Sequence, residues 1–125
     1  RSLKDSGESI IKSAWYDPSR ISEKDLEGYR KNILINNWDT ALWSFTKASF
    51  YRTSAGRVED IRCPVLVLSG DSDVIIPVDK SRELARRIQN SSFRVIEKCG
   101  HLPQEERPDE LMAVIIEFIT SLDSD

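Results

Sequence analysis

The chain has 125 residues, which is enough for one compact domain and too few for two ordinary ones. Hydrophobic residues make up 39% and charged residues 31%, and this balance, with a net charge of −3, is typical of a globular protein rather than a disordered or collagen-like one. No apolar run approaches the ~18 residues of a membrane-spanning helix, and no cluster of Lys and Arg offers a surface for phosphates, so we expect neither a membrane span nor a nucleic-acid partner.

Residues 1–54 are rich in aromatic side chains and have apolar residues at helical spacing. A first helix is predicted up to Trp15, where the turn residues 16–19 end it. Ser22 and Asp25 match a capping box, which predicts the start of a second helix that extends to residue 33. A third helix is predicted to begin near residue 37 or 39 and to end near residue 51. This part of the chain therefore reads as three short amphipathic helices.

The tryptophans and cysteines carry expectations about burial. Trp15, Trp38 and Trp43 all lie in the helical part, and we interpret them as packing residues, with pocket lining as the alternative. Cys63 and Cys99 are too few for a disulfide framework and lack the spacing of metal ligands. Each adjoins an apolar stretch, so we predict two buried free thiols and favour an intracellular, reducing compartment. The compartment is otherwise not predicted.

Strand and helix alternate in residues 55–125. Residues 65–68 form a continuous apolar run, which is typical of a strand covered on both faces in a parallel sheet. A helix is predicted over residues 78–89, a second strand over residues 93–96, and a final amphipathic helix from Pro108. This order predicts an α/β fold, with a right-handed βαβ unit and a closing helix.

Acidic residues and the only histidine follow the two predicted strands. Asp71 and Asp73 come after the first strand, and His101 comes after the second. The carboxyl ends of neighbouring parallel strands meet at one edge of a sheet, where ligand chemistry gathers in such folds. An imidazole that is oriented by a carboxylate suits general base catalysis at neutral pH. We therefore expect His101 and one of the two aspartates to form an acid–base pair.

Two stretches of the sequence resemble the α/β-hydrolase family. Residues 61–77 read Ile-Arg-Cys-Pro-Val-Leu-Val-Leu-Ser-Gly-Asp-Ser-Asp-Val-Ile-Ile-Pro and look like the strand and turn that carry the triad acid. Residues 100–108 read Gly-His-Leu-Pro-Gln-Glu-Glu-Arg-Pro and look like the loop and helix start that carry its histidine. The family pattern places the acid three residues after the glycine. The resemblance therefore implies Asp73 rather than Asp71 as the acid, 28 residues before His101.

The resemblance also implies how the chain is organised. Residues 1–54 are similar to a helical cap remnant with its connecting helix, and residues 55–125 to the C-terminal part of the α/β-hydrolase core. The chain order in this fold is nucleophile, acid, histidine, with the nucleophile on a Gly-x-Ser-x-Gly elbow. No such elbow occurs between Arg1 and Asp125. We therefore expect a C-terminal portion of the fold that supplies the triad acid and histidine and is inactive alone.

The leading interpretation of the intact protein is a serine hydrolase that cleaves an ester, a thioester or a C–C bond next to a carbonyl. Asp73 would orient His101, which would accept the proton of the nucleophile. Val74, Ile75 and Leu102 adjoin these two groups and are expected to line the substrate pocket, although burial in the core explains them almost as well. The aromatic content of residues 1–54 suggests a small apolar substrate, and no metal or other cofactor is expected.

Other interpretations stay open on the sequence alone. An upstream aspartate nucleophile would make the protein an epoxide hydrolase or a dehalogenase, and a ligand receptor with the hydrolase fold would keep the same pair for binding. Asp71 and Asp73 together also fit a phosphatase-like metal site. The strand over residues 65–68 would lack a neighbour on one side. We therefore expect the isolated chain to be unstable or to self-associate through the unpaired strand edge.

Overall fold

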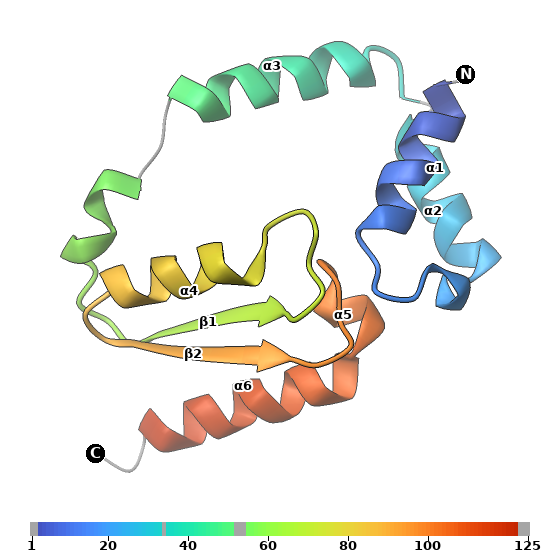
Figure 1. The fold of residues 1–125 in the computed structure, drawn as a ribbon. Helices are drawn as coiled ribbons and strands as arrows, with labels where there is room; N and C mark the ends of the chain where they lie inside the picture. Colours follow the sequence, from blue (N-terminus) through green and yellow to red (C-terminus); the bar gives the residue numbers. More distant parts are fainter. Residues whose placement is uncertain (1–2, 34, 52–54, 123–125) are drawn as a thin grey trace.

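Three helices precede a small parallel sheet and its covering helices (Figure 1). The computed structural model describes residues 3–33, 35–51 and 55–122. The first elements are α1 (Leu3–Ser13), the 3-10 helix η1 (Pro18–Arg20), α2 (Glu23–Ile33), α3 (Trp38–Tyr51) and the 3-10 helix η2 (Ala55–Asp60). They are followed by β1 (Val65–Gly70), α4 (Val78–Arg87), β2 (Ser91–Ile96), α5 (Pro103–Glu106) and α6 (Pro108–Leu122).

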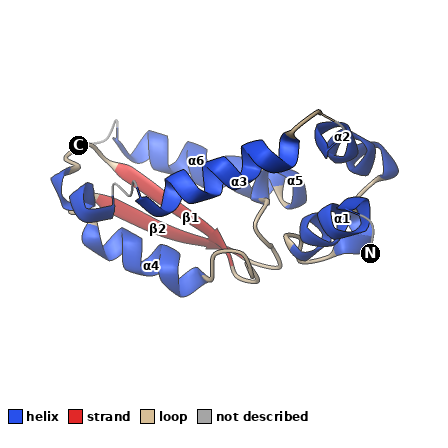
Figure 2. Ribbon diagram, turned by 90° about the horizontal axis from the view of Figure 1, so that it is seen from above, coloured by secondary structure: helices blue, strands red, loops and turns tan. Residues whose placement is uncertain are grey.

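The sheet is a βαβ unit, as the sequence predicts. Strands β1 and β2 run parallel and in register from Val65 opposite Ser91 to Gly70 opposite Ile96. Both views place the strands between α4 and α6 (Figures 1 and 2). On the α4 face, Val67 packs with Ala85 and Ile88. Leu66 and Leu68 are only half-buried, so β1 is less fully covered than its apolar run suggests.

Some element boundaries differ from the predicted ones for local reasons. The helix predicted over residues 78–89 ends at Arg87, because Ile88 takes an extended conformation and its N–H closes the last turn on the Ala85 carbonyl. The second strand begins at Ser91, where register with β1 starts, rather than at residue 93. The sequence does not predict the short helix α5, which lies between the loop of residues 97–102, called here the histidine loop, and α6. The expected boundary at residues 54/55 adjoins residues 52–54, which lie outside the described residues.

The segment between α1 and α2 forms a small hydrophobic core with these helices. Ala14, Trp15, Ile21 and Leu26 are buried together, and Leu102 from the core part of the chain packs against them. The predicted capping box at the start of α2 is confirmed, because the Asp25 N–H donates to Ser22 Oγ at 3.2 Å and the Ser22 N–H donates to Asp25 Oδ2 at 3.3 Å. We call residues 3–33 the lid.

Two expectations about burial are wrong. Trp15 is buried and Trp38 half-buried, but Trp43 is 63% exposed on α3, with the Lys47 ammonium 5.8 Å from the centre of its ring. Helical spacing does not reveal whether a neighbour covers a given face of a helix, so the sequence could not predict the exposure of Trp43.

Of the two cysteines, Cys99 is fully buried, whereas Cys63 is exposed. Cys63 lies before β1, outside the part of the strand that the helices cover. Within the described residues, no helix is both long enough and apolar enough to cross a membrane.

The end of β1 touches the loop after β2 with no room for a side chain. A Cβ atom on Gly70 would lie 2.2 Å from the carbonyl oxygens of both Cys99 and Gly100. Both contacts are backbone atoms, so they have little freedom to move away. Glycine at this position therefore allows the two post-strand loops to meet.

We expect Gly70→Ala to lower the free energy of unfolding by about 2 kcal/mol or more, because overpacking against backbone forces the two loops apart. Urea unfolding followed by tryptophan fluorescence measures this change. Gly28→Ala is the matched control, since a Cβ on Gly28 meets nothing within 4 Å and alanine favours the interior of α2 by up to about 1 kcal/mol. Equal stability of the Gly70→Ala variant and the unchanged chain would contradict the steric argument.

Candidate active site

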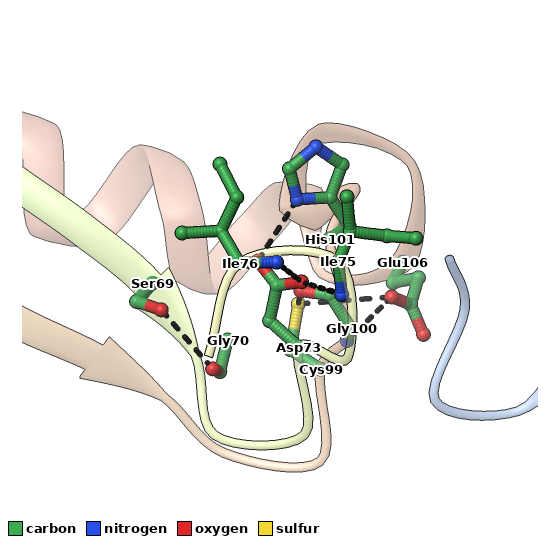
Figure 3. Close-up of polar contacts among 9 residues, drawn as sticks. All are labelled: Ser69, Gly70, Asp73, Ile75, Ile76, Cys99, Gly100, His101 and Glu106. Atoms are coloured by element: carbon green, nitrogen blue, oxygen red, sulfur yellow. Dashed lines mark hydrogen bonds and ion pairs between the residues drawn. The ribbon is translucent and has the colours of Figure 1, made fainter. Parts of the chain in front are cut away.

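Two loops at the carboxyl ends of the strands build the candidate site. Asp73 lies in the turn that follows β1, and His101 lies in the loop that follows β2. Because the strands are parallel and in register, both loops leave the sheet at the same edge. Figure 3 shows the two side chains pointing toward each other across this edge.

Asp73 and His101 form a short hydrogen-bonded pair. Oδ2 of Asp73 lies 2.8 Å from Nδ1 of His101. The Asp73 side chain is 6% exposed, whereas the His101 ring is 34% exposed. An ionised carboxylate only accepts hydrogen bonds, so Nδ1 carries the proton and the other ring nitrogen, Nε2, is left to face the solvent side of the loop. The arrangement is that of a buried acid orienting a reachable base.

The backbone of its own turn holds the Asp73 carboxylate. The N–H groups of Ile75 and Ile76 donate to Oδ1 at 2.8 and 2.9 Å. Burial raises the pKa of Asp73, but the hydrogen bonds from His101, Ile76 and Ile75 outweigh it and bring the pKa below its ordinary value. Asp73 is therefore ionised at neutral pH and fixed in place at both of its oxygens.

Asp71 has a different position from Asp73. Its carboxylate accepts the N–H of Lys98 at 3.0 Å and the N–H of Cys99 at 3.2 Å, which joins the turn after β1 to the loop after β2. Burial raises its pKa, but these N–H groups, the Ser72 hydroxyl and the charge of Arg107 bring it below the ordinary value. Asp71 thus tethers the histidine loop, while Asp73 is the aspartate that contacts the imidazole.

The three expected pocket residues lie in different surroundings. Val74 is 67% exposed and Ile75 is 44% exposed, so neither belongs to the core. Leu102 is half-buried and packs against the lid cluster instead. Within the described residues no three Asp, Glu, His or Cys side chains are grouped as a metal site requires.

Two contacts between lid and core were not foreseen. The Tyr29 hydroxyl donates to both oxygens of Glu105, at 2.6 and 2.7 Å, and joins α2 to α5. Burial and the neighbouring Glu105 carboxylate raise the pKa of Tyr29, so the hydroxyl keeps its proton. In the second contact, Glu106, which is only 3% exposed, accepts the N–H of Tyr16 at 2.8 Å. Both glutamates stand in the polar run Gln-Glu-Glu-Arg, which gives no signal of burial in the sequence.

Comparison with known proteins agrees with this geometry. A profile described as the alpha/beta hydrolase family matches residues 2–114. The chain is 28% identical over 110 residues to 2-hydroxy-6-oxononadienedioate/2-hydroxy-6-oxononatrienedioate hydrolase 1 of Pseudomonas putida, with 84% of this chain and 38% of that protein covered. It therefore spans about two fifths of the length of this curated relative.

Solved structures give the same fold. A serine hydrolase involved in carbazole degradation superposes with a TM-score of 0.82 at 16% identity, covering 94% of this chain and 47% of that one. A thermophilic esterase from Thermogutta terrifontis is 37% identical over a shorter match, with a TM-score of 0.53, 54% of this chain and 25% of that chain covered. On the family match over residues 2–114 and on this likeness of fold, the chain belongs to the α/β-hydrolase family.

Proposed function

We propose that Asp73 and His101 are the acid and the base of a catalytic triad whose nucleophile lies outside these 125 residues. The observation that carries the proposal is the 2.8 Å contact between Asp73 Oδ2 and His101 Nδ1. In this proposal residues 55–125 are the C-terminal part of the hydrolase core and residues 1–54 belong to its cap. The absence of a Gly-x-Ser-x-Gly elbow between Arg1 and Asp125 supports this division.

The proposed mechanism follows from the different roles of the two ring nitrogens of His101. Asp73 holds the proton on Nδ1, which leaves the lone pair on Nε2 to accept the proton of the attacking hydroxyl. The ionised carboxylate then stabilises the imidazolium that forms. Nε2–H then donates this proton to the leaving group, and the deprotonated Nε2 afterwards accepts a proton from the attacking water. Asp73 remains ionised throughout, in keeping with its lowered pKa.

The proposed reaction is hydrolysis of an ester, a thioester or a C–C bond next to a carbonyl in a small, apolar substrate. The names of relatives support this range, since the Pseudomonas putida protein is a 2-hydroxy-6-oxononadienedioate hydrolase and the Thermogutta terrifontis protein an esterase. Apolar character is supported by Val74 and Ile75, which are exposed in the turn directly after Asp73.

The proposal is tested in the protein extended toward its N-terminus until it includes a nucleophile elbow. We expect Asp73→Asn and His101→Ala each to lower kcat by about 10³- to 10⁴-fold, because each removes the oriented base. The assay is hydrolysis of a p-nitrophenyl ester, with labelling by a fluorophosphonate to identify a serine nucleophile. Asp79→Asn, on an exposed side chain of α4, is the matched control and should leave kcat unchanged.

The 125-residue chain serves as a second control for this experiment. We expect it to hydrolyse the same ester no faster than its own His101→Ala variant, because it lacks the nucleophile and the oxyanion donors. Turnover that depends on His101 in this chain would overturn the proposed division of the triad. In the extended protein, an Asp73→Asn variant with unchanged kcat would overturn the assignment of the acid.

We further propose that the free edge of β1 is an association surface in the isolated chain. Among the described residues, β1 has a strand neighbour only on its β2 side. Its other edge presents the unpaired backbone groups of a strand with the apolar sequence Val-Leu-Val-Leu, which favours pairing with a second copy.

We expect the isolated chain to sediment as a mixture of monomer and oligomer whose proportions change with concentration. Sedimentation velocity measures this distribution, and hydrogen exchange locates the contact. The β1 amides that do not bond to β2 should become protected as the concentration rises. A monomer at every concentration with a single cooperative melting transition would refute the proposed surface.

A further inference from the structure

Glu106 is a buried acid that the proposed mechanism does not use. It ends α5 and is 3% exposed, a degree of burial that charged residues reach only when they are paired. Asp73 is the residue that contacts the imidazole, whereas the hydrogen bonds of Glu106 in Figure 3 lead to Gly100 and Cys99. Its burial therefore calls for another explanation.

The two oxygens of Glu106 accept hydrogen bonds from two distant segments. Oε1 accepts the N–H of Gly100 at 2.6 Å, and Oε2 accepts the N–H of Tyr16 at 2.8 Å. The Cys99 thiol also points at Oε1, with a sulfur–oxygen distance of 3.9 Å. Burial and the charge of Glu106 raise the pKa of Cys99 to about 11, so the thiol keeps its proton. One side chain thus joins the histidine loop to the lid.

A backbone hydrogen bond lies directly beside this bridge. The N–H of His101 donates to the carbonyl of Ala14 at 2.6 Å. Gly100 leaves no space between the segments, since a Cβ there would lie 2.3 Å from the Ala14 oxygen and 2.8 Å from Glu106 Oε1. We call residues 14–16, residues 100–101 and Glu106 the lid junction.

We propose that Glu106 is a positioning residue, which fixes the backbone of His101 against the lid so that the imidazole meets Asp73 only while residues 14–16 are docked. The catalytic meaning of this positioning rests on the proposed function. The positioning itself is a property of the chain and is measured without any activity.

The chemistry of the carboxylate makes this proposal specific. Both oxygens of Glu106 accept from N–H groups, whereas a glutamine has one acceptor and one NH₂ group. In either orientation of its amide, Glu106→Gln leaves one of the two N–H groups facing another donor. The variant keeps the size of the side chain and removes one of the two hydrogen bonds. Its effect therefore measures the lost hydrogen bond and not a change in packing.

The test uses the imidazole of His101, which is the only histidine and gives a unique signal in ¹⁵N NMR spectra. In the unchanged chain we expect a slowly exchanging Nδ1 proton, held by Asp73. In Glu106→Gln this proton should exchange about tenfold faster or more, or its signal should vanish, because a hydrogen bond to a charged group is lost. Glu110→Gln is the matched control, since its carboxylate is 56% exposed on α6. A wild-type Nδ1 signal in Glu106→Gln would overturn the proposal.

Hydrogen exchange of backbone amides in the unchanged chain is a second test, and it does not depend on whether a variant folds. The amides of Tyr16, Gly100 and His101 should share one protection factor, because they open together when the lid junction opens. Exchange of the Tyr16 amide independently of Gly100 would show that the lid and the histidine loop are not coupled. Neither outcome depends on whether the extended protein is a hydrolase.

Discussion

The close approach of backbone at the carboxyl ends of β1 and β2 is the constraint on which the site depends. Because Gly70 has no side chain, the loop after β2 lies directly against the end of β1. Asp71 then reaches across to the N–H groups of Lys98 and Cys99, and this brings the next turn of the chain, with Asp73, level with His101. The contact between Asp73 and His101 is thus a consequence of how two parallel strands end.

The lid provides a second support for the loop that carries His101. Its small core of Ala14, Trp15, Ile21 and Leu26 receives Leu102, the residue after the histidine. Tyr29 and Glu105 add a second attachment through α5. The histidine loop is therefore held from two sides, by Asp71 in the turn after β1 and by the lid. Its geometry depends on contacts with both the N-terminal and the C-terminal part of the chain.

Local patterns in the sequence predicted much of this arrangement. The Ser22–Asp25 capping box, the apolar run of β1 and the position of an acidic pair and a histidine after the two strands are local features, so they can be recognised without knowing the fold. The choice of Asp73 over Asp71 came from the resemblance to the α/β-hydrolase family. The exposure of Trp43 and the burial of Glu106 depend on which distant segment lies opposite. No pattern in neighbouring residues carries that information, which explains why both were missed.

The hydrogen bond between Tyr16 and Glu106 joins residues that are 90 positions apart, whereas β1 and β2 pair segments separated only by α4 and its loops. Closing a longer loop costs more chain entropy, and contacts of high sequence separation slow folding. The strands can therefore pair before the lid docks, and the histidine loop receives its second support last. In a refolding chain, the contacts at the ends of the strands can thus place the loop that carries His101 before residues 14–16 reach it.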